Sequence, residues 1–139
     1  MYALTRSDRR AEWFTAQGIS PLLGDVTLPT TLPTLPPLDT LQVSIGFDRS
    51  SGGTIHEVYV DGLQNLLTIL PDTTRRIVYT SSTGVYGQTD GSQVDEQSPC
   101  RPTRAGGKAC LDAEHALVDS RWGRRTVVLR LAGIYGPER

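Results

Sequence analysis

The sequence lacks any apolar run near the roughly 20 residues that a membrane-spanning helix needs, and its first seven residues lack a charged segment followed by an apolar core. Neither charge sign is in excess, because 14 lysines and arginines stand against 15 acidic residues and the basic ones form only short pairs. We therefore expect no membrane span, no signal peptide, no nucleic-acid partner and no membrane partner, and we expect a cytoplasmic protein.

Metal-binding and disulfide patterns are also lacking. Cys100 and Cys110 are the only cysteines, ten residues apart, and the two histidines have no metal-ligand spacing between them. We expect two free thiols and no metal site. Lysine is nearly absent as well, since Lys108 is the only one in the chain.

The 139 residues allow one domain at most. Apolar patterning predicts strands and helices in alternation. The predicted strands cover residues 1–6, 19–24, 41–47, 77–80 and 126–131, and the predicted helices cover 8–17, 55–70 and 104–121. Four prolines make residues 26–40 an extended connector.

Helix boundaries are marked by capping residues. Ser7 is a predicted N-cap, and Gly18 stands where a helix-ending glycine belongs. Thr54 and Glu57 have the spacing of a capping box, and Thr103 is the predicted cap of the last helix.

Alternating strands and helices predict an α/β fold with a parallel sheet of about five strands and flanking helices. The last predicted strand, 126–131, is nearly continuous in apolar character. Such a run is typical of a strand covered on both faces.

Three segments together carry a family resemblance. They are Tyr79-Thr-Ser-Ser-Thr-Gly-Val-Tyr-Gly87, Val94-Asp-Glu-Gln-Ser-Pro99 and Val127-Val-Leu-Arg-Leu-Ala-Gly-Ile-Tyr-Gly-Pro137. With the helix between them, they resemble the NAD-dependent epimerase/dehydratase family of extended and atypical short-chain dehydrogenase/reductases. The resemblance implies a Rossmann-type fold, a nicotinamide dinucleotide cofactor, and a small-molecule substrate for which a nucleotide sugar is the expected class.

The resemblance implies roles at the end of the chain's fourth strand. Ser82, four residues before Tyr86, matches the family position whose hydroxyl contacts the reacting oxygen. Ser81 is implied in cofactor binding. The alternative is that both serines merely end a strand and cap a turn. The stretch Ala132-Gly133-Ile134 matches the loop whose backbone passes the nicotinamide.

At the adenosine end the resemblance implies four cofactor-binding residues. Arg6 and Ser7 follow the first predicted strand, where an acidic residue would favour NAD. The basic Arg6 favours NADP over NAD; the alternative is a surface arginine beside a helix start. Asp25 matches the position facing the adenine amino group, and Gly46 the stretch near the adenine ribose.

The sequence departs from the family pattern in three places. It has no GxxGxxG turn to hold a pyrophosphate, and it ends soon after the IYGP motif. It also has no Tyr-x-x-x-Lys pair. An ungapped match places Gly106 and Cys110 at that pair, whereas a shift of two residues places Arg104 and Lys108 there, so Lys108 is a weaker catalytic candidate.

Three interpretations stay open for this incomplete NAD(P)-binding Rossmann-like domain, residues 1–139. The chain belongs to an oxidoreductase or epimerase that transfers hydride, to a non-catalytic dinucleotide-binding sensor or scaffold, or to an inactive truncated fragment. Because a parallel sheet without its first strand leaves edges and apolar faces uncovered, we expect a marginally stable or aggregation-prone monomer. The sequence does not determine an oligomeric state.

Overall fold

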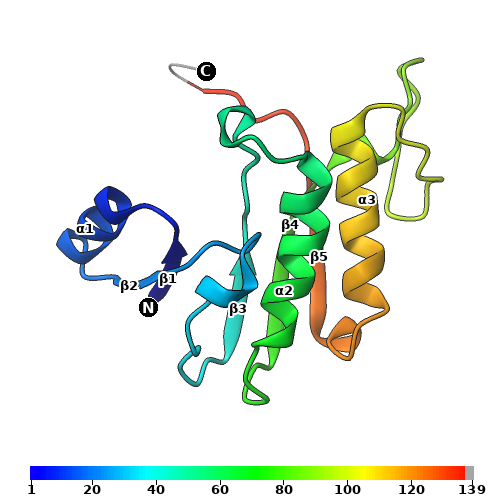
Figure 1. The fold of residues 1–139 in the computed structure, drawn as a ribbon. Coiled ribbons are helices and arrows are strands. Elements are labelled where there is room, and N and C mark those ends of the chain that lie inside the picture. Colours follow the sequence, from blue (N-terminus) through cyan, green and yellow to red (C-terminus); the bar gives the residue numbers. More distant parts are fainter. Residues whose placement is uncertain (137–139) are drawn as a thin grey trace.

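The protein was analysed as a computed structural model that describes residues 1–136, so Pro137 of the last motif lies outside the described residues. Strands and helices alternate along the described chain (Figure 1). The strands are β1 (Tyr2–Thr5), β2 (Ser20–Leu23), β3 (Thr40–Val43), β4 (Arg76–Ser82) and β5 (Thr126–Leu131). The helices are α1 (Asp8–Ala16), α2 (Gly62–Thr68) and α3 (Ala105–Val118).

All strand pairings are parallel, as predicted, but the strands form two sheets rather than one. One sheet has the order β1-β2 and the other the order β3-β4-β5. In the first, Leu4 is opposite Leu22; in the second, Tyr79 is opposite Val43 on one side and Val128 on the other. The expected α/β, partial Rossmann-type arrangement is thus confirmed, with a break between β1 and β3.

Helices α2 and α3 lie side by side against one face of β3-β4-β5 (Figure 1). The main core lies between these layers and includes the fully buried side chains of Leu63, Ile77 and Leu117. The opposite face of β5 is uncovered: Val127, Leu129 and Leu131 are 47%, 42% and 41% exposed. The prediction that this strand is covered on both faces was therefore wrong, because within residues 1–136 helices pack on only one of them.

Most of the predicted helix caps are present. The Ser7 hydroxyl accepts from the Arg10 amide at 3.3 Å, and Gly18 has a φ of 72°, the left-handed value that favours glycine after a helix. Thr54 and Glu57 exchange reciprocal side-chain bonds of 2.6 and 3.1 Å. The cap of α3 was wrong by one residue: Arg104 takes that position, without a side-chain cap bond.

The predicted helix over 55–70 is present but is not α-helical throughout. Glu57–Asp61 forms a π-helical stretch directly before α2. Its end packs on the connector, where a Cβ on Gly62 would lie 2.8 Å from Val26 Cγ2. Within residues 1–136, no helix is long and apolar enough to cross a membrane. The cytoplasmic location stays a prediction.

Candidate functional site at the carboxyl ends of the strands

The predicted site residues follow the carboxyl ends of parallel strands, which is where open α/β sheets bind their ligands. Arg6 and Ser7 follow β1, Asp25 follows β2, and Gly46 follows β3. Ser82 ends β4, and 132–134 follow β5. A hydrogen bond of 2.9 Å between the hydroxyls of Ser44 and Thr80 joins β3 and β4 at this edge.

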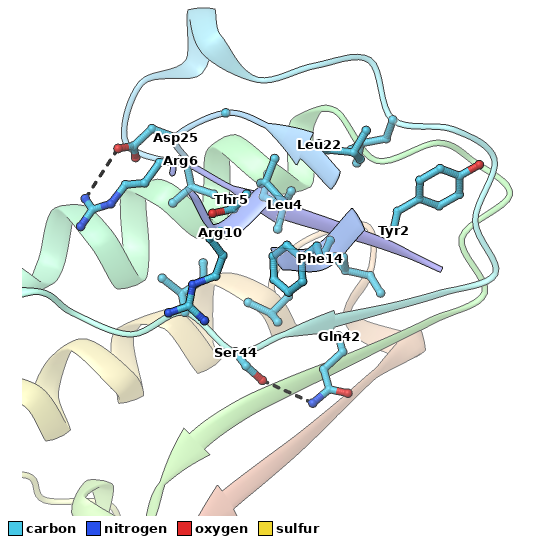
Figure 2. A pocket seen from close by; sticks show the side chains of 18 of the residues that line it. Tyr2, Leu4, Thr5, Arg6, Arg10, Phe14, Leu22, Asp25, Gln42 and Ser44 are labelled. Carbon is cyan, nitrogen blue, oxygen red and sulfur yellow. Dashed lines mark hydrogen bonds and ion pairs between the residues drawn. The ribbon is translucent and has the colours of Figure 1, made fainter. Parts of the chain in front are cut away.

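Arg6 brings the ends of the two sheets together. Its Nη1 lies 3.7 Å from Asp25 Oδ2, and its Nη2 lies 3.2 Å from Asp48 Oδ2 (Figure 2 shows the pair with Asp25). The Arg6 side chain is still 48% exposed. The guanidinium is therefore held between two carboxylates and remains open to solvent.

Asp25 is ionised and firmly held. Burial opposes its ionisation, but hydrogen bonds from the Thr27 hydroxyl and amide, at 2.7 and 2.9 Å, and the Arg6 charge lower its pKa below the usual value. A carboxylate fixed in this way can accept a hydrogen bond from an exocyclic amino group. The pKa of Asp48 is also lowered, mainly by hydrogen bonds from Ser50 and further by Arg6.

Gly46 has open space around its backbone, whereas the Ser7 hydroxyl already makes a hydrogen bond. Gly46 is exposed, and a Cβ built on it would meet no atom within 4 Å, so a ligand could approach its backbone closely. Ser7 caps α1, so its hydroxyl oxygen already accepts one hydrogen bond. Arg6, Asp25 and Gly46 line one cavity of about 940 Å³, whereas Ser82 and 132–134 lie outside it.

The two serines that end β4 face opposite sides of the sheet. Ser81 is 5% exposed, and its hydroxyl lies 2.5 Å from Glu114 Oε1 on α3. Ser82 is partly exposed, and its hydroxyl accepts from the Gly84 amide at 3.1 Å. Of the pair, Ser82 is the one with the more exposed side chain.

Glu114 anchors a buried polar network that the sequence analysis did not predict. Arg130 Nη2 donates to Glu114 Oε2 at 2.7 Å, and its Nη1 donates to the Tyr86 hydroxyl at 3.0 Å. The pKa of Arg130 is raised, chiefly by its hydrogen bonds to Glu114. A signal was available in the sequence, because Glu114 falls on the inward side of α3 and Arg130 interrupts an apolar strand.

The structure separates the two alternatives for the Tyr-x-x-x-Lys pair. Cys110 is buried and close to Ser81, and burial, with Glu114 nearby, raises the pKa of its thiol. It is a neutral group where the ungapped match expects a cation. Lys108 is exposed, and two residues turn a helix by about 200°, so it lies on the opposite side of α3 from Cys110. The structure does not bring Lys108 to Ser82.

The segment after β5 adjoins the Ser82 turn. Leu131 pairs with Ser82, and the Thr83 hydroxyl donates to the Leu131 carbonyl at 3.4 Å. Ala132, Gly133 and Ile134 are all exposed. Within residues 1–136, no three His, Cys, Asp or Glu side chains are grouped as metal ligands.

Comparison with known proteins identifies the family. The family model described as "NAD dependent epimerase/dehydratase family" matches residues 42–139. Protein YeeZ of Escherichia coli (strain K12) is 35% identical over 102 residues, which are 73% of this chain and 36% of that protein.

Two solved structures resemble the whole chain. A conserved protein of unknown function from Silicibacter pomeroyi is 33% identical, with a TM-score of 0.71 over 98% of this chain and 45% of that one. DesIV, a dTDP-glucose 4,6-dehydratase from Streptomyces venezuelae solved with NAD and TYD bound, is 22% identical, with a TM-score of 0.77 over 98% of this chain and 47% of that one. The second likeness shows the fold alone. This chain spans about a third of the curated relatives and about half of these solved structures.

Proposed function

This chain belongs to the NAD-dependent epimerase/dehydratase family, and from that premise we propose that it binds a nicotinamide dinucleotide across the carboxyl ends of its strands. The observation that carries the proposal is the meeting of Arg6, Asp25 and Gly46 at one cavity. These residues come from the ends of β1, β2 and β3, although they are up to 40 positions apart in the sequence.

The adenosine end of the cofactor would lie at this cavity. The fixed Asp25 carboxylate would accept from the adenine amino group, and the open backbone at Gly46 would face the ribose. Arg6 and Ser7 would contact the ribose or its 2′-phosphate. An exposed guanidinium favours NADP over NAD, although Asp25 and Asp48 share its charge.

The nicotinamide end would lie near Ser82 and the backbone of 132–134. The cofactor, when bound, supplies a hydride acceptor or donor. Ser82 accepts a hydrogen bond from Gly84, which orients its hydroxyl and leaves its own proton to donate to a substrate oxygen. The assignment of Ser81 to cofactor binding stays a prediction, and its bond to Glu114 would have to open for direct contact.

For a longer protein that contains this chain, we propose a hydride-transfer reaction. A nucleotide sugar, or a related compound with a carbonyl or hydroxyl group, is the proposed substrate class. Ser82 would polarise the reacting oxygen. Lys108 remains the weaker catalytic candidate, because it is exposed on the far side of α3.

A second candidate function, dinucleotide binding without turnover, is favoured by Cys110. A thiol with a raised pKa stays neutral, so it cannot lower the pKa of a phenol as a neighbouring lysine would. Gly106, one helical turn earlier, supplies no phenol at all. A sensor or scaffold needs neither group.

Fluorescence titration of the 139-residue chain with NADPH and with NADH tests the proposal. We expect saturable binding of both, tighter for NADPH, and weaker NADPH binding in Arg6→Ala than in the control Arg9→Ala, which removes an exposed arginine from α1. Failure of both dinucleotides to bind would contradict the proposal and favour the inactive fragment. Binding without absorbance change on addition of nucleotide sugars would favour the second candidate.

A further inference from the structure

The two cysteines of the chain lie against the same buried cluster, just after the Ser82 turn. Cys110 forms this cluster with Val85 and Tyr86, and Cys100 packs against it. Both cysteines are free thiols in this structure; Cys110 is buried and Cys100 is half-buried. The fold therefore brings together the only two thiols in the sequence.

The backbone after Cys100 runs across the start of α3. The amide of the next residue donates to the Tyr86 carbonyl at 3.2 Å. A Cβ on Gly107 would lie 3.0 Å from the Pro102 Cβ, so this segment touches the first turn of the helix. Gly107 and Cys110 are three positions apart on α3 and so share a face. The segment that begins at Cys100 thus packs on the helix face that carries Cys110.

The two thiols also adjoin the same polar network. Arg130 donates to the Tyr86 hydroxyl at 3.0 Å and to Glu114 at 2.7 Å. The pKa of Arg130 is raised, chiefly by Glu114, and the nearby Cys100 thiol adds to the rise. Burial and the nearby Glu114 carboxylate raise the pKa of the Cys110 thiol. Cys100 is therefore near the arginine of this network and Cys110 near its glutamate.

We propose that Cys100 and Cys110 form a thiol–disulfide exchange site, which a small-molecule disulfide such as oxidised glutathione converts to an intramolecular disulfide. Cys100 reacts first, because it is the more accessible thiol. After its proton passes to water, its thiolate attacks one sulfur of the small disulfide, which forms a mixed disulfide and releases one small thiolate. That thiolate takes up a proton from water.

Cys110 completes the exchange. It loses its proton to water and attacks the Cys100 sulfur, which releases the second small thiolate. Because the Cys110 thiol is buried and neutral, this step is the slower one. Two protein thiols are thereby oxidised to one disulfide, and one small disulfide is reduced to two small thiols, so hydrogens and electrons balance.

The disulfide would tie the end of the loop before Cys100 to α3. Cys110 is the position that the ungapped match assigns to the lysine of the family pair, and it lies close to Ser81. Oxidation would therefore act beside the predicted active-site serine. The inference does not rest on dinucleotide binding, because neither cysteine lines the cavity of about 940 Å³ at Arg6.

The direct test is to incubate the 139-residue chain with oxidised glutathione, block the remaining thiols with N-ethylmaleimide and digest with trypsin. Trypsin cuts after Arg104 and Lys108, so the two cysteines fall in separate peptides. We expect a species that joins these two peptides until it is reduced, and an intact protein lighter by two hydrogen atoms. No oxidation, glutathione that stays on Cys100, or a disulfide between two copies of the chain would overturn the proposal.

A pair of variants tests the order of the two steps. Cys110→Ala removes the second thiol, so we expect glutathione to stay attached to Cys100. Cys100→Ala leaves only the buried thiol, and we expect it to react at least about tenfold more slowly than Cys100 does in the parent chain. Equal rates would contradict the assignment of Cys100 as the first thiol.

A comparison with the unfolded chain tests whether the fold itself brings the thiols together. The equilibrium constant for disulfide formation is measured in mixtures of reduced and oxidised glutathione, with and without concentrated urea. We expect it to be at least about tenfold larger in the folded chain, because the fold holds the two thiols near each other. An equal or smaller constant in the folded chain would overturn the proposal. NADPH titration of the oxidised chain reports separately on dinucleotide binding.

Discussion

Arg130 on β5 holds Glu114 on α3 by both carboxylate oxygens, with Nε at 3.1 Å from Oε1 and Nη2 at 2.7 Å from Oε2. The Glu114 side chain is only 6% exposed and that of Arg130 is 21% exposed. The same carboxylate accepts from Ser81, and the same guanidinium lies 4.9 Å from the centre of the Tyr86 ring. This contact ties the helix layer to the sheet directly beneath the predicted active-site serine.

Loss of the Glu114 charge should destabilise the fold. Glu114→Gln leaves Arg130 partly buried without its counter-ion, and breaking one partner of a buried pair costs about 3 kcal/mol or more. We expect the free energy of unfolding in urea to fall by about 2–3 kcal/mol, the lower values reflecting the exposed part of Arg130. Asp112→Asn, at an exposed position of the same helix, should change it by less than about 0.5 kcal/mol. Equal effects of the two variants would show that the pair contributes nothing specific.

Adjacent glycines at the start of α3 should respond oppositely to alanine. A Cβ on Gly107 would collide with the Gly84 carbonyl and lie 3.0 Å from Pro102 Cβ, whereas a Cβ on Gly106 would meet only Ile55 Cδ1 at 3.6 Å. Gly107→Ala should therefore lower stability by about 1–3 kcal/mol. Gly106→Ala should raise it by up to about 1 kcal/mol through helix propensity. Thermal unfolding of both variants checks that Gly106→Ala is the more stable. A Gly107→Ala protein as stable as the parent would show that the turn at Gly84 is free to move.

Asp25 should make stability depend on pH in the acid range. Its pKa is lowered in the folded chain, so the unfolded chain takes up its proton first as the pH falls. The stability that the Asp25 carboxylate contributes is complete above its pKa in the unfolded chain, about 3.9. It is lost as the pH drops through the lower pKa of the folded chain. Asp25→Asn should lower the free energy of unfolding at pH 7. It should also make the decline of that free energy below about pH 4 less steep. Glu96→Gln, at an exposed loop position, should leave that decline unchanged, and a parallel decline in Asp25→Asn would contradict the assignment.

Asp48 should limit the affinity for a 2′-phosphate. Its carboxylate contacts Arg6 at 3.2 Å and adds a negative charge where the phosphate would bind. Asp48→Asn should tighten NADPH binding by about twofold to fivefold, as expected for an exposed charge, with little change for NADH. Raising the salt concentration should reduce the difference. If Asp48→Asn tightened NADH binding equally, the 2′-phosphate would not lie near Arg6.

If turnover is found, replacing Ser82 and replacing Lys108 should affect its rate differently. Ser82→Ala removes the hydroxyl at the end of β4 and should abolish hydride transfer while NADPH still binds. Lys108→Ala should leave turnover nearly unchanged, because this side chain is exposed on the far side of α3. Ser92→Ala, in the exposed loop, controls for the loss of a hydroxyl. Unchanged turnover in Ser82→Ala would remove this serine from the mechanism.

Local features of the structure were determined by the sequence. The Ser7 cap, the Thr54–Glu57 capping box and the strand at 126–131 all appear where the pattern predicted them, because each depends on neighbours within a few residues. The parallel arrangement also followed from the alternation of strands and helices. The predicted cap of α3 at Thr103 was wrong by one residue, since Arg104 is the N-cap and has an extended backbone.

Only the tertiary structure decided which side chains meet. Arg6 and Asp48 are 42 residues apart, and Ser81 and Glu114 are 33 apart, so no local pattern encodes their contact. The strand period of two makes adjacent serines face opposite sides, but only the position of α3 determines which of them is buried. The break between β1 and β3 is likewise visible only in the tertiary structure, because the alternation of strands and helices predicted one sheet and the strands form two.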